Sequence, residues 1–279
     1  MSDTAQPAAH AAPSVFVVFF GTIGRVTLNT LYPLAKVAAL IVDTLNWVFV
    51  KPLGGHGLRL RAAVREYVQF GYKSLPIVGL ICFLLGAILA LQTAYQLERF
   101  GATRLIATLV GVAAMRELAP LMTAILLTGR SGSAITAEIG TMKVSEEIDA
   151  LHVMGINPTK YLIVPKFIAM VLAFPSVTVL ATAIMILGGM SIGVFYVGIA
   201  PNVYLNVTAQ ALSWSDFLSG MTKSVFYGVV VCFVGVYRGF QVTGGAEGVG
   251  RMTTSSVVTS IFLIIVVDLI FTIMFVAPA

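Results

Sequence analysis

The sequence has few charged residues and few cysteines. Only 10% of its 279 residues are Asp, Glu, Lys or Arg, whereas about 25% is usual in a soluble domain. The hydrophobic share is 58% and the mean hydropathy is +0.96. We therefore expect an integral membrane protein. The two cysteines, Cys82 and Cys232, both lie in apolar runs, so neither a disulfide framework nor a thiolate metal site is indicated.

Sequence signals for catalysis and nucleotide binding are also missing. The histidines His10, His56 and His152 are scattered without metal-ligand spacing, so hydrolytic metal chemistry has little support. No segment fits the phosphate-binding pattern G-x-x-x-x-G-K-[ST], and Lys223-Ser224 lacks the preceding glycine. We expect no enzyme activity, metal or cofactor in this chain. The net charge of +5 does not require nucleic acid, because the basic residues gather at the ends of apolar runs.

Long apolar runs without strand-type alternation predict an all-α, polytopic membrane protein. Lipid requires every backbone polar group to find an internal partner, and helices meet that requirement. The apolar intervals predict spans at Ser74–Leu97, Leu105–Gly129, Phe167 onward, Trp214–Tyr237 and Met252–Val276.

The interval from Phe167 to Ser215 carries no charge and has two interpretations. It could form one span followed by an apolar hairpin, or two spans that turn at Gly188-Gly189. Two spans would move Arg238 and Arg251 to the exported side, against the positive-inside tendency. One span is therefore preferred, which gives five crossings, a cytoplasmic N-terminus and an exported C-terminus.

The beginning of the chain differs from the rest. Residues 1–13 lack a basic leader region and are expected to be disordered. In residues 14–73, charges and Pro33 interrupt every run before it reaches spanning length. We expect an interfacial amphipathic segment, anchored by Trp47, and a linker; a sixth, poorly formed span is the alternative. Residues 74–279 would form the five-span domain.

A polar island, Gly129–Tyr161, interrupts the apolar sequence. Ser145 is placed to cap a short helix, and Glu146 and Glu147 would lie in its first turn, where the helix dipole favours negative charge. Gly155 would end the helix. Its apolar face would consist of Ile148, Leu151 and Met154. Because so short a helix is marginal alone, we expect it to pack against a partner; a solvated loop is the alternative.

Four charged residues fall inside the predicted spans. Lys223, Asp268, Arg116 and Glu117 would lie about 13 to 18 Å below the outer ends of their helices. An ionised side chain at mid-membrane costs about 2.5 to 3.5 kcal/mol, so each needs a partner or a water-filled cavity. The four could form a salt-bridge layer, or some could meet a lipid headgroup in a cavity. Pro120 leaves the carbonyl of Arg116 without its helical N–H and predicts a kink.

Apolar and small residues supply two more predictions. Leu89, Tyr95 and Phe100, at the outer end of the first span, could line an acyl-chain pocket, although ordinary lipid-facing or core positions are the alternative. The pairs Gly86-Ala87 and Gly188-Gly189 predict close helix packing.

One segment, Ala113–Ala169, carries a family resemblance. Its motifs RELAP, GRSGSA, AEIGTMKVSEEIDAL, MGINP and P-K-F resemble, in order and spacing, the signature of MlaE/YrbE-type permeases. These are membrane subunits of ABC lipid transporters that work with MCE-domain proteins. The resemblance implies a bacterial inner-membrane location. It also implies a role in ATP-driven phospholipid transport between the inner and outer membranes, and so in outer-membrane asymmetry.

The resemblance further implies partners and site residues. The partners would be a second copy of the chain, ABC ATPase subunits that bind ATP and Mg, a periplasmic MCE hexamer and, in some members, a STAS-domain protein. The coupling element, residues 130–160, would dock on the ATPase through Glu138, Lys143, Glu146, Glu147, Ile148, Asp149, Leu151 and Met154. The lipid cavity would involve Arg116, Glu117, Leu89, Tyr95, Leu97 and Phe100.

Two other functions are compatible with the sequence. An MCE-linked permease could carry a different hydrophobic molecule. An ion-coupled secondary transporter would also place paired charges in the membrane, but it usually shows internal repeats, and none is evident.

Overall fold

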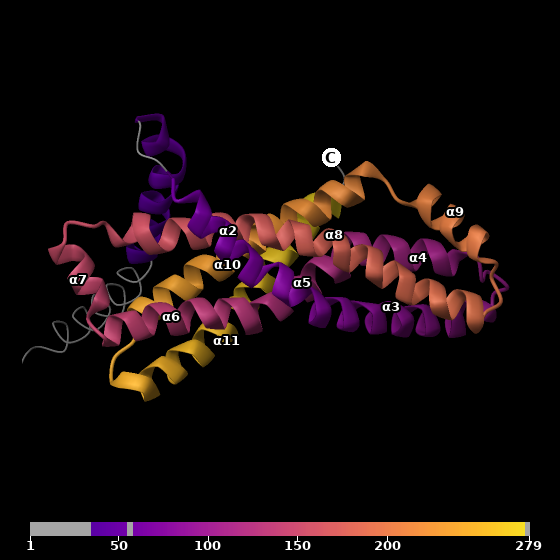
Figure 1. The fold of residues 1–279 in the computed structure, drawn as a ribbon. Coiled ribbons are helices and arrows are strands. Elements are labelled where there is room, and N and C mark those ends of the chain that lie inside the picture. The colour runs from indigo at the N-terminus through magenta and orange to yellow at the C-terminus, as the bar shows by residue number, and fades with distance from the viewer. Residues whose placement is uncertain (1–34, 55–57, 277–279) are drawn as a thin grey trace, which may run out of the picture. The chain divides into compact units, whose positions relative to one another are not determined.

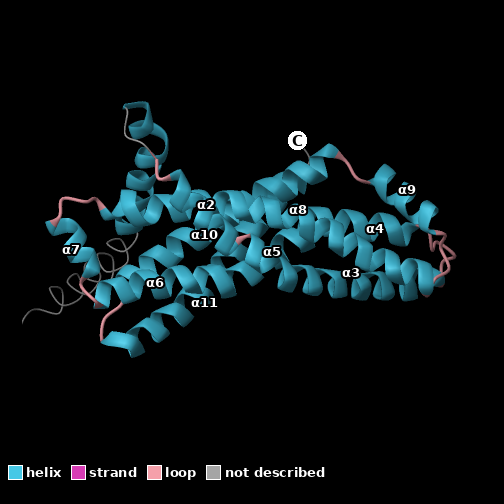
Figure 2. Ribbon diagram, viewed as in Figure 1, coloured by secondary structure: helices cyan, strands magenta, loops and turns pink. Residues whose placement is uncertain are grey.

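The computed structural model describes residues 35–54 and 58–276, and within these ranges the chain forms helices and loops with no strand (Figure 2). It divides into two units, Met1–Asp43 and Thr44–Ala279. In the first unit, residues 35–43 are helical. The predicted leader, residues 1–13, lies outside the described residues. The helices discussed below belong to the second unit (Figure 1).

Five helical segments of the described chain are long and apolar enough to cross a membrane. They are Leu60–Glu98, Leu105–Val144, Thr159–Phe195, Trp214–Phe240 and Gly245–Phe275. This confirms the predicted all-α, polytopic fold. Helix α8 (Val164–Phe195) is one span, and Gly188-Gly189 lie inside it. The alternative with a turn at these glycines is therefore wrong.

The first span is reached through a series of short helices. These are η1 (Asn46–Val50), η2 (Lys51–Gly54), α2 (Leu60–Phe70) and η3 (Tyr72–Ser74). Helix α3 (Leu75–Glu98) follows; its 24 residues extend about 36 Å, enough to cross about 30 Å of hydrocarbon.

The second span is a single helical rod with two wide turns. Helices α4 (Leu105–Ala113), α5 (Ala119–Leu127) and α6 (Ser133–Val144) are joined by the π-helical turns η4 (Ala114–Leu118) and η5 (Thr128–Gly132). Turn η4 explains how the rod accommodates Pro120. A proline in a regular helix clashes with the carbonyl four residues earlier. Here the N–H of Ala119 donates to the carbonyl of Ala114 instead, which widens the helix just before the proline.

The remaining elements complete the bundle. They are α7 (Glu147–Val153), η6 (Thr159–Ile163), α8, α9 (Pro201–Ala211), α10 (Trp214–Phe240) and α11 (Gly245–Val276). Helix α9 packs against α4 and α8. Its Tyr204 is fully buried and fits against Gly189 and Gly193: an added Cβ would lie 2.9 Å from its hydroxyl oxygen at Gly189 and 2.8 Å from its ring at Gly193. Burial raises the pKa of Tyr204 to about 12, so its phenol stays protonated.

Helices α3 and α8 are in backbone contact. A Cβ atom added at Gly86 would lie 1.9 Å from the carbonyl oxygen of Met185, and one at Gly188 would lie 2.0 Å from that of Phe83. Only glycine permits this approach. The close packing predicted at Gly86-Ala87 and Gly188-Gly189 is therefore confirmed at Gly86 and Gly188.

Candidate functional site

The two ends of the bundle differ in charge. The basic end holds the end of α6, the start of α8 and the loop between α10 and α11; it contains Lys143, Lys160, Arg238 and Arg251. Helix α7 projects from this end, whereas α9 and the α3–α4 connection lie at the opposite end (Figure 1). That connection holds Arg99 and Arg104.

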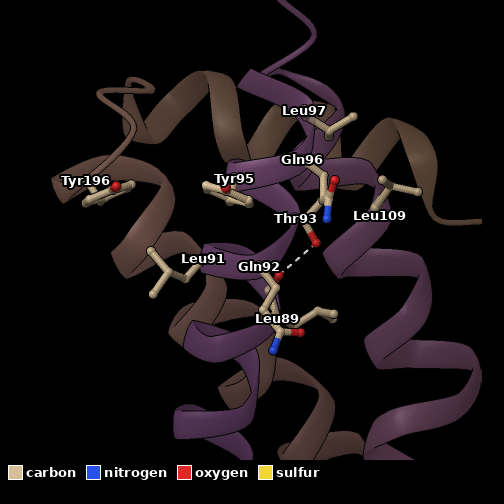
Figure 3. A pocket seen from close by; sticks show the side chains of 9 residues that line it. All are labelled: Leu89, Leu91, Gln92, Thr93, Tyr95, Gln96, Leu97, Leu109 and Tyr196. Atoms are coloured by element: carbon tan, nitrogen blue, oxygen red, sulfur yellow. Dashed lines mark hydrogen bonds between the residues drawn. The ribbon is translucent and has the colours of Figure 1, made fainter. Parts of the chain in front are cut away.

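A cavity of about 840 Å³ opens near the opposite end. Its lining consists of Leu89, Leu91, Gln92, Thr93, Tyr95, Gln96, Leu97, Leu109 and Tyr196. Figure 3 shows the two tyrosines on the same side of the pocket and the Thr93 hydroxyl bonded to the carbonyl of Leu89. Apolar side chains therefore share this cavity with two amides and two phenols.

The structure sorts the predicted cavity residues into two groups. Leu89, Tyr95 and Leu97 line the cavity, whereas Arg116, Glu117 and Phe100 do not. Phe100 is 79% exposed beyond the end of α3. Sequence reasoning missed Gln92 and Gln96. Their spacing of four residues within an apolar span places two amides on one helix face, and that signal could have identified them.

Lys223 is the centre of a buried ion cluster. Its Nζ lies 2.5 Å from Oε2 of Glu117, 2.9 Å from Oδ1 of Asp268 and 2.7 Å from Oγ1 of Thr272. Lys223 is fully buried. The Tyr227 hydroxyl donates to Oδ1 of Asp268 at 2.6 Å. This Lys223 cluster joins η4, α10 and α11, and its two carboxylates share one ammonium group.

Arg116 belongs to a different ion pair from the Lys223 cluster. Its guanidinium lies 3.6 Å from Oδ1 of Asp216 and donates to the carbonyl of Phe275 at 3.3 Å. Asp216 also forms a capping box with Ser213 at the start of α10. Arg116 therefore ties the beginning of α10 to the end of α11. Its side chain is 30% exposed, so the guanidinium keeps access to the surface.

The beginning of α7 differs from the prediction. Ser145 ends α6, and its hydroxyl donates backwards to the carbonyl of Thr141 at 2.9 Å. Glu146 precedes α7 with a φ of 58°. An N-cap serine requires extended backbone and a hydroxyl directed at the following turn. The predicted Ser145 cap is therefore wrong, because α6 runs on to Val144 and uses Ser145 at its own C-terminus.

The rest of α7 follows the predicted pattern in part. Glu147 and Asp149 lie in its first turn. At the other end Gly155 adopts a φ of 71°, and the N–H of Ile156 donates to the carbonyl of Leu151 at 2.9 Å, as in a Schellman cap. Ile148 and Leu151 are buried, but Met154 is 63% exposed. Of the predicted coupling residues at α7, Glu146, Glu147, Asp149 and Met154 are exposed, and Val153 beside them is 89% exposed.

Two predicted coupling residues, Lys143 and Glu138, lie on α6 and make polar contacts within the bundle, although the Glu138 side chain is 45% exposed. The ammonium of Lys143 donates to the carbonyl of Phe240 at the end of α10. Glu138 lies 2.7 Å from the Nζ of Lys166. Lys166 is 1% exposed, and its Nζ also lies 2.6 Å from Oε1 of Glu66 on α2. We call these three charged residues the Lys166 junction; it connects α2, α6 and α8.

Residues 63–274 match the family described as Permease MlaE. The chain belongs to this family. Several MlaE-family and ABC permeases are similar to it. A probable ABC transporter permease of Rickettsia typhi is 37% identical over 215 residues, which cover 77% of this chain and 83% of the relative. The intermembrane phospholipid transport system permease protein MlaE of Haemophilus influenzae is 37% identical over 210 residues, 75% of this chain and 80% of the relative.

A plant protein is also similar to this MlaE-family chain. The chloroplastic protein TRIGALACTOSYLDIACYLGLYCEROL 1 of Arabidopsis thaliana is 35% identical over 210 residues, which cover 75% of this chain and 60% of the plant protein. The family match begins within α2 and ends within α11. It therefore includes the cavity, the Lys223 cluster, the Lys166 junction and α7.

Proposed function

We propose that this chain is the membrane-spanning subunit of an ATP-driven phospholipid transporter acting between the inner and outer membranes of a bacterium. It would work as a homodimer in the inner membrane, and ATP and Mg would bind to separate ABC ATPase subunits. The proposal is supported by membership of the MlaE family and by the name of the Haemophilus influenzae relative.

The proposal rests on one structural observation, the cavity at the end of the bundle that holds α9 and the α3–α4 connection. Its volume of about 840 Å³ falls in the upper part of the range for small-molecule sites, about 300 to 1,000 Å³. Leucines from α3 and α4 suit acyl chains, whereas Gln92, Gln96 and Tyr196 supply hydrogen-bonding groups for a headgroup. A phospholipid combines both chemistries. The Arg116 guanidinium lies outside this cavity, so any contact with lipid phosphate would occur at a separate surface.

The two ends of the bundle would meet different partners. By the positive-inside tendency, the basic end faces the cytoplasm, where α7 would dock on the ATPase. The opposite end would then face the periplasm and an MCE-domain hexamer, and a STAS-domain protein could accompany the ATPase.

Filling the cavity should reduce the amount of bound lipid. Leu89→Trp and Leu97→Trp place large rings where the acyl chains would lie, and overpacking of this kind should lower phospholipid occupancy by about tenfold. The measurement is mass spectrometry of lipid extracted from the purified complex, together with ATP-dependent lipid transfer between vesicles. Leu180→Trp, at a 46% exposed position on α8, is the matched control. Unchanged lipid content and transfer in both cavity variants would contradict the proposal.

Reversing the acidic charges of α7 should weaken docking of the ATPase. Glu147 and Asp149 are exposed in the first turn, where they complement the helix dipole. Combined Glu147→Lys and Asp149→Lys should lower ATPase affinity by about tenfold or more, because like charges would oppose a basic docking surface. Copurification and lipid-dependent ATP turnover measure this effect. Glu247→Lys reverses an exposed first-turn acid at the same end, on α11, and should leave docking intact; equal losses in both would argue against a docking role for α7.

A further inference from the structure

Helix α2 extends beyond the part of the first span that the membrane requires. The segment Leu60–Glu98 has 39 residues and would measure about 58 Å if straight, whereas the hydrocarbon core is about 30 Å thick. Helix α3 alone is long enough to cross it. The short turn η3 separates the two helices, so α2 lies at or beyond the membrane boundary at the basic end.

The outward face of α2 combines an apolar stripe with two cations. Leu60, Val64 and Val68 recur every four residues and are 61%, 61% and 41% exposed. Arg61 and Arg65 are also exposed. Each follows a stripe residue by one position and is therefore turned from it by about 100° around the helix. Neither arginine forms an ion pair or side-chain hydrogen bond with any residue that the structure describes.

The inward face of α2 is fastened to the bundle. Ala63 and Phe70 are buried, and Glu66 enters the Lys166 junction. The same ammonium holds Glu138 on α6, nine residues before α7 begins. At its start, α2 is also tied to η6, because Arg59 lies over the ring of Tyr161 at 3.9 Å. A movement of α2 would therefore displace both α6, which precedes α7 in the chain, and η6, which follows it.

We infer that α2 binds anionic phospholipid headgroups at the surface of the adjacent leaflet, and that the Lys166 junction transmits this binding to α6 and α7. The apolar stripe enters the acyl boundary while Arg61 and Arg65 reach the headgroup phosphates, as in interfacial amphipathic helices. The charges favour lipid over a transmembrane helix of a partner protein as the occupant, because such a helix would desolvate both arginines without neutralising them. The transmission step rests on the proposed function; the binding step does not.

The binding step is tested on the full chain without its ATPase. An environment-sensitive NBD fluorophore on Val64→Cys reports insertion, since the native Cys82 and Cys232 are buried. Vesicles contain phosphatidylcholine with or without phosphatidylglycerol, and brominated lipids act as quenchers. We expect quenching that is stronger with phosphatidylglycerol, and an affinity for it that falls about fivefold with Arg61→Gln or Arg65→Gln. Arg251→Gln, an exposed cation at the same end, should have no effect.

Two results of this experiment would overturn the binding step. Absence of quenching by brominated lipid would show that protein covers the stripe. Equal quenching with and without phosphatidylglycerol would show that the arginines do not recognise anionic headgroups.

The transmission step is tested on the complex with its ATPase in nanodiscs. Phosphatidylglycerol should change ATP turnover by roughly fivefold in the unsubstituted protein. Glu66→Ala should abolish this dependence while the NBD signal of α2 persists. Glu66 is the appropriate position because Lys166 keeps Glu138 as its partner, so no buried charge is left alone. Retention of the full lipid dependence in Glu66→Ala would overturn transmission through the junction. If no ATPase associates with the chain at all, the proposed function fails, while the fluorescence result still decides the binding step.

Discussion

Replacing Lys223 with methionine is expected to destabilise the protein by about 3 to 5 kcal/mol, the usual cost of removing one partner from a buried ion pair. Glu117 and Asp268 would then face each other without the ammonium group that both now contact. The Tyr227 hydroxyl donates to Asp268 and the Thr272 hydroxyl donates to Glu117, but neither hydroxyl carries a charge that could replace the ammonium. We expect a large loss of membrane accumulation and a lower midpoint of thermal unfolding in detergent.

A variant in which all three charged residues are neutralised distinguishes two causes of destabilisation, an unpaired buried charge and the loss of side-chain packing. Lys223→Met combined with Glu117→Gln and Asp268→Asn leaves no uncompensated charge, and replacement of a complete buried ion cluster by neutral groups is often close to neutral. The triple variant should therefore recover most of the lost stability. Additive losses across the three substitutions would show that the residues do not act as one cluster.

The second large effect is expected where α3 and α8 touch. Gly86→Ala and Gly188→Ala each place a Cβ about 2 Å from a backbone carbonyl oxygen, far inside van der Waals contact, and the backbone cannot rotate away as a side chain could. The helices must separate, so each substitution should lower the free energy of unfolding by about 3 kcal/mol or more, the upper end of the usual range for overpacking. Thermal unfolding of the purified protein measures this loss.

Gly250→Ala is the matched control for the glycine contacts. This helical glycine has no atom within 4 Å of an added Cβ, so the substitution should be neutral or stabilising by about 0.5 to 1 kcal/mol. Equal stability of Gly86→Ala and Gly250→Ala would mean that α3 and α8 do not rely on backbone contact.

The spans were predictable because the membrane imposes a strong physical constraint on composition. The lengths of the uninterrupted apolar runs predicted the five spans. The number of Lys and Arg residues on each side of the membrane then favoured one span over two after Phe167. The small-residue pairs Gly86-Ala87 and Gly188-Gly189 indicated the α3–α8 contact, because no side chain fits at Gly86 or Gly188. The cavity was predicted only in part: Leu89, Tyr95 and Leu97 line it, but the contribution of Tyr196 depends on how the end of α8 packs against α3.

Other features depended on information that local sequence does not contain. The predicted spans ended at the first polar residues, but the helices continue beyond them. Helix α6 runs through polar residues to Val144, so Ser145 ends α6 and does not begin α7. Arg116 and Glu117 are adjacent and join different ion pairs, because successive residues of a helix point about 100° apart; which partner each one meets depends on how α10 and α11 pack around η4. Lys166 immediately precedes the charge-free interval that begins at Phe167, a position typical of a solvated cation at a span end, and its burial follows only from the packing of α2 and α6 around α8.

The Lys223 cluster also bears on the order in which the protein is assembled. Each charge would oppose entry of its own helix into lipid by about 2.5 to 3.5 kcal/mol on insertion scales. Lys223 and Asp268 lie on helices joined by a loop of only four residues, 241–244, so the two spans can neutralise each other and leave the translocon as a hairpin. Glu117 is synthesised 106 residues before Lys223. Its carboxylate must stay in contact with water until that hairpin arrives, so the second span can be fully buried in lipid only after the last two spans have docked against it.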